Sequence, residues 1–336
     1  MTGIASEDVI RCRVKLRNPF TVEHLPPLSL IHRAAFRVRR RLSKRFVGRP
    51  AKRLFRLLVA AGMGGDGRAS MLLGDGGRRT IHFNARNTQF GALYLPQSLP
   101  VYEPETSALL DRLVGDGDVF FDIGANWGWY ALLVASRPGF KGSIHAFEPF
   151  PSTLADLRSV VGQAGLEAVI ACHGVALADR EGEASMGFSD GVQSGLARLG
   201  EAGGDKVGLA RLDALGLPAP QVIKIDAEDH ELEVLLGAEA IIAASRPVIV
   251  FENWLHQTRP SLTLAPIQLL AGQGYRFFYP GWEGGDADCV LAQPGEGARL
   301  ALVPFLPAQR FLLPSQVNVV AVPAERHAAF ASRFAD

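Results

Sequence analysis

The sequence predicts an α/β fold in which a mostly parallel sheet carries helices on both faces. From about residue 104, short apolar runs alternate with segments of helical periodicity, and this order is typical of parallel sheets. Hydrophobic residues make up 48% of the chain and charged residues 21%, as in ordinary globular proteins. No stretch approaches the ~18 uninterrupted apolar residues of a transmembrane helix. The 336 residues allow one large domain with an appendage, or two domains.

The individual elements follow from the same periodicities. Strands are predicted at residues 119–123, 143–147, 168–172, 222–225 and 248–251, and residues 276–279 and 317–322 are predicted to close the sheet. Helices are predicted at residues 105–113, 129–136, 153–162, from 231 onward, and near 266–273. Thr153 and Asp156 form a T-x-x-D pattern, which predicts a capped start for the third of these helices. These elements assign residues 104–336 to one α/β domain.

The region before residue 104 has a different composition. Residues 1–60 hold 15 Lys and Arg against 3 Asp and Glu, so residues 1–61 are predicted to form a basic, mostly helical arm. Residues 62–103 are predicted to form a connecting region with a β-hairpin around the GDGG turn. The basic apolar stretch at residues 28–61 favours peripheral contact with an anionic membrane. Docking on the acidic body or on a second subunit, as in a homodimer, is the alternative. No nucleic-acid partner is expected, because the arm contains few aromatic residues.

Cysteine usage bears on the cellular location. Cys12, Cys172 and Cys289 lie far apart and form neither a disulfide framework nor a zinc-binding spacing, which suits a reducing cytosol. The first residues include acids and lack an apolar core, so no secretory signal is expected. These features predict a cytoplasmic protein that contacts the inner face of the membrane through its arm.

Ligands of such sheets bind beyond the carboxyl ends of the strands, and polar residues gather at those positions. The first strand ends in Asp122 and then Gly124, with Gly128 completing a G-x-x-x-G spacing. A dinucleotide turn would show G-x-G-x-x-G, so the acid before these glycines favours a cationic or amino-bearing ligand. Glu148 ends the second strand, where a carboxylate can accept both hydroxyls of a ribose.

Two further strand ends carry ionisable or amide side chains. The strand at 222–225 is followed by Asp226, Glu228, Asp229 and His230, too many ionisable groups to be explained by solvation alone. The strand at 248–251 is followed directly by Glu252 and Asn253. Chemistry is therefore predicted where these strand ends meet.

Several ordered blocks of the sequence resemble the FkbM family of S-adenosylmethionine-dependent methyltransferases. The blocks are FDIGANWGWY, AFEP, VALADREGEASM, LDAL, IKIDAEDHELEVLLGA and PVIVFEN. The upstream VYEPE and the closing NVVAVP fit the same pattern, so the resemblance covers roughly residues 95–323. The resemblance implies a Rossmann-like class I methyltransferase sheet and S-adenosylmethionine as the cofactor. Residues 1–60 fall outside it.

The resemblance also implies roles for individual residues. The residues that would surround the methionyl part of the cofactor are Asp122, Gly124, Ala125, Asn126 and Gly128. Glu148 would hold the ribose, and Ala176 and Asp179 would lie near the adenine. Asp226 and Glu228 would face the transferred methyl group and the acceptor. The family usually reads D-x-E-G at this point, whereas this chain has Asp229, which tolerates a positive φ better than most residues.

The predicted reaction is methylation of a hydroxyl on a small molecule or glycan, a glycolipid or a secondary metabolite. A hydroxyl benefits from a nearby base, and Asp226 or Glu228 is expected to take its proton, with His230 as the alternative. A second hypothesis is a Mg²⁺ ion held by Asp226, Glu252 and Asn253, which resembles the metal site of catechol-type O-methyltransferases. The rival functions are N-methylation, and an inactive nucleoside fold that binds anionic membrane or polymer.

Overall fold

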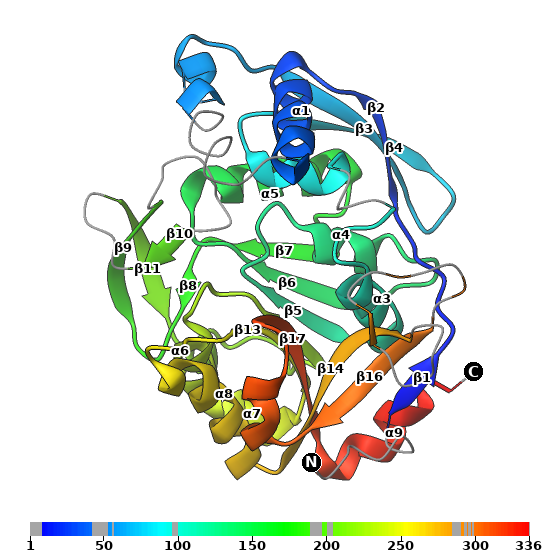
Figure 1. The fold of residues 1–336 in the computed structure, drawn as a ribbon, viewed down its shortest axis with the longest axis vertical. Coiled ribbons are helices and arrows are strands. Elements are labelled where there is room, and N and C mark those ends of the chain that lie inside the picture. The colour runs from blue at the N-terminus through cyan, green and yellow to red at the C-terminus, as the bar shows by residue number, and fades with distance from the viewer. Residues whose placement is uncertain are drawn as a thin grey trace.

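The computed structural model has a ten-stranded sheet at its centre (Figure 1). The structure describes residues 9–41, 53–55, 57–95, 100–188, 197–199, 204–283, 290–291, 294, 297 and 299–335. No helix in these ranges is both long and apolar enough to cross a bilayer.

Half of the central sheet is parallel. Its strands, in spatial order, are β13 (Val248–Trp254), β12 (Val222–Ile225), β5 (Val119–Ile123), β6 (Ser143–Phe147) and β7 (Ile170–His173). These strands are short, nearly continuous apolar runs, because a parallel sheet is covered by protein on both faces. The predicted strands at 119–123, 143–147 and 222–225 are confirmed to the residue.

The other half of the sheet is antiparallel and continues from β13. Its strands are β17 (Gln316–Pro323), β14 (Tyr275–Glu283), β16 (Leu300–Phe305) and β1 (Ile10–Cys12), with β15 (Val290–Leu291) beside β14. The edge strand β1 comes from the region predicted to be a helical arm. That prediction is therefore wrong for residues 10–12, whose backbone completes the main sheet instead.

Helices cover both faces of the sheet, as predicted. They are α3 (Pro104–Leu113), α4 (Trp129–Ala135), α5 (Pro151–Ala164), α6 (Glu231–Leu236), α7 (Glu239–Ser245), α8 (Pro260–Gly272) and α9 (His327–Ser332). Side chains alternate across a strand, so Phe120 packs into the core beneath α3, α4 and α5, whereas Phe121 packs into the core beneath α6, α7 and α8. This alternation produces two separate apolar cores.

The predicted cap of α5 is not formed. The helix begins at Pro151 with Phe150 at its N-cap, because proline fits the first helical turn. Thr153 is buried, and Asp156 instead accepts hydrogen bonds from Asn84 and Asn87. Asp156 therefore fastens the preceding region of the chain to α5.

Two smaller sheets flank the main one. The first contains β2 (Phe20–His24), β3 (Asp66–Leu72) and β4 (Arg78–Asn84), and the second contains β8 (Ala176–Leu177), β9 (Gly182–Phe188), β10 (Ala197–Leu199) and β11 (Asp205–Ala210). The hairpin predicted around GDGG is confirmed as β3–β4, and β2 adds a third strand to it. Helix α1 (Pro27–Arg41) and the 3₁₀ helix η2 (Thr88–Leu93) pack beside this sheet (Figure 1).

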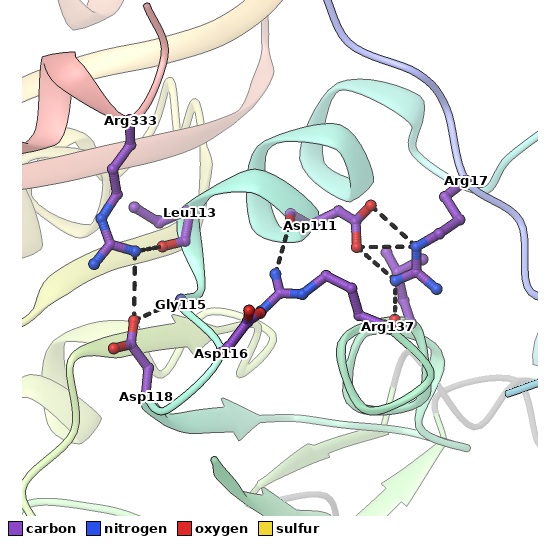
Figure 2. A network of polar contacts seen from close by, with 9 residues as sticks. Arg17, Asp111, Leu113, Gly115, Asp116, Asp118, Arg137 and Arg333 are labelled. Carbon is purple, nitrogen blue, oxygen red and sulfur yellow. Dashed lines mark hydrogen bonds and ion pairs between the residues drawn. The ribbon is translucent and has the colours of Figure 1, made fainter. Parts of the chain in front are cut away.

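A polar network fastens both ends of the chain to α3 (Figure 2). Arg17 donates from Nε to Asp111 Oδ2 over 3.1 Å, and Arg137 Nη1 donates to the Asp111 carbonyl over 2.7 Å. Arg333 contacts Asp118 and the carbonyl of Leu113 at the other end of the helix. The network fixes α3, and Glu103, the N-cap residue of this helix, lines the cavity described below.

Candidate active site

A cavity of about 270 Å³ opens where the parallel strands β5, β6, β12 and β13 end. This is the position at which the strand order predicted a ligand. The lining residues that carry a charged or amide side chain are Gln89, Glu103, Asn126, Glu148, Lys224, Asp226, Glu228, Glu252 and Gln316. Apolar and aromatic side chains complete the wall, including Tyr130, Phe147, Met186 and Trp254.

The turn after β5 brings the backbone close to the cavity. Gly124 has φ +75°, and a Cβ placed on it would lie 1.8 Å from the carbonyl oxygen of Asp226. Only glycine fits both this conformation and this approach. The N–H groups of Gly124 and Ala125 donate to the Phe147 carbonyl over 3.0 and 2.9 Å, so the turn also closes onto β6. The structure therefore requires glycine at position 124 for the turn itself, and the ligand-binding role of the turn stays a prediction.

Glu148 lies at the end of β6, where it was predicted, and it lines the cavity. Its Oε2 accepts from the Asn126 backbone N–H over 3.0 Å, and its Oε1 accepts from the Phe150 N–H over 2.9 Å. These two contacts fix the carboxylate and leave lone pairs that face the cavity. Burial raises the pKa of Glu148 to about 7, and the two N–H donors moderate this effect.

Asp122 lies beneath the turn and does not line the cavity. Its Oδ2 accepts from the Ala131 N–H over 3.1 Å, while Oδ1 has no hydrogen-bond partner among the described residues. Burial raises the pKa of Asp122 to about 6, and nearby Lys224 opposes the shift. A buried carboxylate oxygen without a partner is costly, so it is suited to a donor supplied by a ligand or water.

Lys224 and Asp226 form a pair at the end of β12. Lys224 Nζ lies 2.9 Å from Asp226 Oδ2 and 4.8 Å from the centre of the Tyr130 ring. Burial alone would lower the pKa of Lys224, but the carboxylates of Asp226, Asp122 and Glu103 together raise it. Lys224 therefore stays charged. The Tyr130 ring beside it is fixed by its hydroxyl group, which donates a hydrogen bond to Glu103 Oε2 over 2.6 Å.

The loop after β12 has an unusual backbone. Glu228 and Asp229 adopt positive φ angles of 51° and 75°. The expectation that position 229 requires a positive φ is therefore confirmed. His256 Nε2 lies 3.0 Å from Asp229 Oδ1, which supports the loop from the end of β13.

His230 faces the cavity at the start of α6. Its Nδ1 lies 3.3 Å from the carbonyl oxygen of Glu228, which can only accept a hydrogen bond. The contact therefore favours the tautomer that carries the proton on Nδ1, with Nε2 as the acceptor. Glu231, the next residue, lies in the first turn of α6 and accepts from the Ala227 N–H over 3.0 Å, which ties the loop to the helix.

The predicted metal triad is not assembled. Asp226 and Glu252 line the cavity, but the Asn253 side chain points elsewhere: it donates to the Thr263 carbonyl over 2.9 Å and accepts from buried Arg310. Asn253 is therefore a structural residue, and the hypothesis that it is a metal ligand is wrong. Consecutive residues of a strand face opposite sides, so Glu252 and Asn253 cannot both face one ion. Groups of three or more His, Cys, Asp or Glu residues suited to a metal are absent from the described ranges.

The remaining predicted residues divide between the cavity wall and positions behind it. Ala176 lines the cavity, as expected for a residue near the adenine. Gly128 does not line it, but its φ of +97° allows the start of α4 to pack against Leu157. Asp179 also lies outside the wall and pairs with Arg180 over 3.1 Å.

Sequence reasoning missed four residues of the wall with a charged or amide side chain: Gln89, Glu103, Lys224 and Gln316. Lys224 carries a recognisable signal, because a lysine within the buried strand VIKI needs a buried partner. Gln316 donates to Glu252 Oε1 from the antiparallel strand β17, and no local pattern marks it. The charge of Glu103, together with burial, raises the pKa of Tyr102 well above the ordinary value of tyrosine. Burial, together with Glu103, does the same for the pKa of Tyr130.

Comparison with known proteins identifies the family of this region. Residues 122–277 match the model of the methyltransferase FkbM domain, which confirms the resemblance predicted from the sequence. The chain is 29% identical over 152 residues to the hexuronic acid methyltransferase AglP of Haloferax volcanii. That match covers 44% of this chain and 61% of the relative's length.

Solved structures of low sequence identity are also similar. Methyltransferase FkbM from Methylobacillus flagellatus KT is 20% identical, with a TM-score of 0.40 over 65% of this chain and 53% of that chain. The O-methyltransferase TomG from Streptomyces achromogenes, solved in complex with S-adenosylmethionine, is 17% identical, with a TM-score of 0.37 over 65% of this chain and 87% of that chain.

Proposed function

We propose, on the premise that residues 122–277 carry an FkbM methyltransferase domain, that this protein transfers a methyl group from S-adenosylmethionine to a sugar hydroxyl. The acceptor class we favour is a glycan, a glycolipid or a glycosylated metabolite. The relative AglP is named as a hexuronic acid methyltransferase, and this supports a sugar acceptor.

The observation that carries the proposal is the charge of the cavity wall. Five carboxyl groups, those of Glu103, Glu148, Asp226, Glu228 and Glu252, line the cavity, and Lys224 is the one lysine or arginine among the described lining residues. Charges of one sign around a partly enclosed space favour a ligand of the opposite sign. S-adenosylmethionine carries a sulfonium and an ammonium group, whereas an anionic nucleotide would be repelled.

The residues present also fit the shape and hydrogen bonding of this cofactor. Glu148 offers fixed carboxylate oxygens to the ribose hydroxyls, whereas Asp122 lies behind the Gly124 turn and outside the cavity wall. Gly124, Ala125 and Asn126 line the cavity, so their backbone can flank the methionyl chain. Phe147 and Ala176 offer apolar surface for the adenine. When bound, the cofactor supplies an activated methyl group, so the chain needs chiefly to align the acceptor and exclude water.

The acceptor hydroxyl must lose its proton, and the loop after β12 provides candidate bases. His230 presents Nε2 as an acceptor, and Asp226 and Glu228 line the same wall. Asp226 is already paired with Lys224, so its carboxylate is held in place. We assign the proton to Asp226 or Glu228, with His230 as the alternative, in agreement with the expectation from the sequence.

The mouth of the cavity has features that suit a sugar. Trp254 is 39% exposed and lines the cavity, so its indole offers an apolar face at the entrance. Burial and the neighbouring Asp226 raise the pKa of Glu252 well above its usual range, which favours the protonated carboxyl group, a form that can donate a hydrogen bond. Together with Gln316, it can orient a hydroxyl-bearing ring.

Two experiments test this function. Calorimetry with S-adenosylhomocysteine should give saturable binding to the full-length protein, and no binding would support the rival reading of an inactive fold. Incubation with methyl-labelled cofactor and separated lipid and polysaccharide fractions should label a carbohydrate-containing fraction. A product in which the label is attached to nitrogen would instead support N-methylation, because a carboxylate-lined cavity also accepts an amine.

A further inference from the structure

Exposed apolar side chains concentrate in the N-terminal region. The structure describes nine large hydrophobic side chains as exposed. Four of them lie between residues 30 and 63: Leu30 (45% exposed), Leu54 (50%), Leu57 (67%) and Met63 (36%). These four side chains lie within 34 residues of the sequence. Exposed aliphatic side chains that share one surface indicate a binding partner, whereas isolated ones do not.

The helical stretches at residues 53–55 and 57–60 have two apolar sides. Phe55 is 7% exposed and packs against Leu28 of α1 and Ala85, and its ring centre lies 6.1 Å from that of His32. Leu54 and Leu57, three positions apart, form the opposite side and remain exposed. The inner contacts dock this segment on α1, so the outer leucines are held on a structured surface.

The charge of the same region is strongly positive. Helix α1 reads PLSLIHRAAFRVRRR, with five arginines and no acid. Residues 1–60 hold 15 Lys and Arg against 3 Asp and Glu. Basic groups beside exposed aliphatic groups are the combination that binds the interface of an anionic bilayer. A polyanion such as nucleic acid would use the charges but would leave Leu54 and Leu57 in water.

The 3₁₀ helix η2 lies between α1 and the cavity. Helix α1 packs against η2, and His32 Nδ1 lies 3.0 Å from the hydroxyl of Tyr94, which follows η2. Gln89 and Ala92 of η2 line the cavity. Contact of α1 with a bilayer would therefore bring one wall of the cavity close to the membrane surface.

We propose that α1 and residues 53–55 and 57–63 form a docking surface for an anionic lipid bilayer, with Leu30, Leu54, Leu57 and Met63 entering the interface and Arg33 and Arg53 contacting the headgroups. This inference is independent of the proposed function, because it concerns a different surface and its test requires no turnover.

The test is co-sedimentation of the full-length protein with extruded vesicles of phosphatidylcholine alone or with 30% phosphatidylglycerol, a composition chosen to give a surface charge on the order of a cytoplasmic leaflet. Wild type should bind the anionic vesicles, and binding should weaken as salt rises. The Leu54→Gln/Leu57→Gln variant should lose about tenfold or more in partitioning. Arg33→Gln/Arg53→Gln should also bind less tightly.

The matched control is Leu306→Gln/Leu312→Gln, which changes two leucines that are 67% and 82% exposed elsewhere on the molecule. It should bind as wild type does. A Leu57→Trp variant provides a gain-of-signal measurement: relative to wild type, its emission should shift to the blue only with anionic vesicles. The proposal would be overturned if the protein did not bind anionic vesicles, or if the control variant lost as much binding as the Leu54/Leu57 variant. It would also be overturned if the protein bound heparin tightly in place of vesicles and that binding did not depend on Leu54 and Leu57.

Discussion

Lys224 Nζ lies 2.9 Å from Asp226 Oδ2, and the two side chains connect the buried sheet to the wall of the cavity. The lysine side chain is 3% exposed and the aspartate 31%, so the pair has one end in the protein interior and one at the ligand space. Lys224 also lies opposite Asp122 in the strand register. One buried ammonium group thus balances carboxylates on two neighbouring strands.

The Lys224→Met variant should therefore be unstable. Removal of the ammonium group leaves Asp226 and Asp122 without their cation, and we expect a loss of about 3 kcal/mol in the free energy of unfolding. Urea denaturation followed by circular dichroism measures this change. Lys141→Met, at an exposed position, should stay within about 0.5 kcal/mol of wild type. Equal stability of the two variants would contradict the importance of the pair.

The Glu148→Gln variant should bind S-adenosylhomocysteine about 10–100-fold more weakly. Both carboxylate oxygens accept backbone N–H groups, and an amide can satisfy one of them only. Calorimetry measures the dissociation constant. Glu105→Gln is the matched control, because burial also raises the pKa of Glu105 to about 7 but this residue does not line the cavity. Unchanged affinity in Glu148→Gln would remove Glu148 from the site.

Thermal stability should be lower at about pH 8 than at about pH 5.5. Burial raises the pKa of Glu148 and Glu231 to about 7 and that of Asp122 to about 6. Because these values exceed the ordinary ones of about 4, the folded state holds protons more tightly than the unfolded state between about pH 4 and 7, so stability falls across that range and levels off above it. We expect a decrease of roughly 5 °C in the melting temperature.

The cofactor should partly reverse this decrease. S-adenosylmethionine is cationic at sulfur and should raise the melting temperature more at pH 8 than at pH 5.5, when the carboxylates are ionised. The neutral sulfur of S-adenosylhomocysteine provides the matched comparison and should show a smaller difference between the two pH values. Equal shifts for the two ligands would contradict the charge argument.

The Gly124→Ala variant should fold poorly or lose about 4 kcal/mol of stability, since the added methyl group would meet the Asp226 carbonyl at a positive φ. Gly117→Ala is the control, because a Cβ at that position meets no atom within 4 Å. Comparable melting temperatures for both variants would show that the turn can relax.

Exhaustive chelation should leave methyl transfer unchanged. Asn253 is occupied by Thr263 and Arg310, so one of the three predicted ligands is unavailable to Mg²⁺ and the oxygen triad is incomplete. Turnover measured after treatment with EDTA, with and without added Mg²⁺, tests this. If chelation abolished activity and added Mg²⁺ restored it, the enzyme would need a metal ion that is bound by other groups.

Much of the parallel half of the fold could be predicted from local pattern. The strands at 119–123 and 222–225 are buried apolar runs, and Gly124 and Glu148 follow from what a strand end and a tight turn require. The antiparallel half of the sheet was harder to predict from the sequence. Strand β1 has only three residues, and its pairing with β16 depends on chain segments nearly 300 residues apart.

By itself, the sequence determined the alternation of strands and helices, the glycine turn, the acidic residues at the strand ends and the basic N-terminal region. Only the tertiary structure decided which of those residues face one another. Asn253 turned away from Glu252 because neighbouring strand residues point to opposite faces, and Lys224 joined Asp226 because burial requires a counterion. Local periodicity places a residue on an element, but the packing of distant elements decides what its side chain meets.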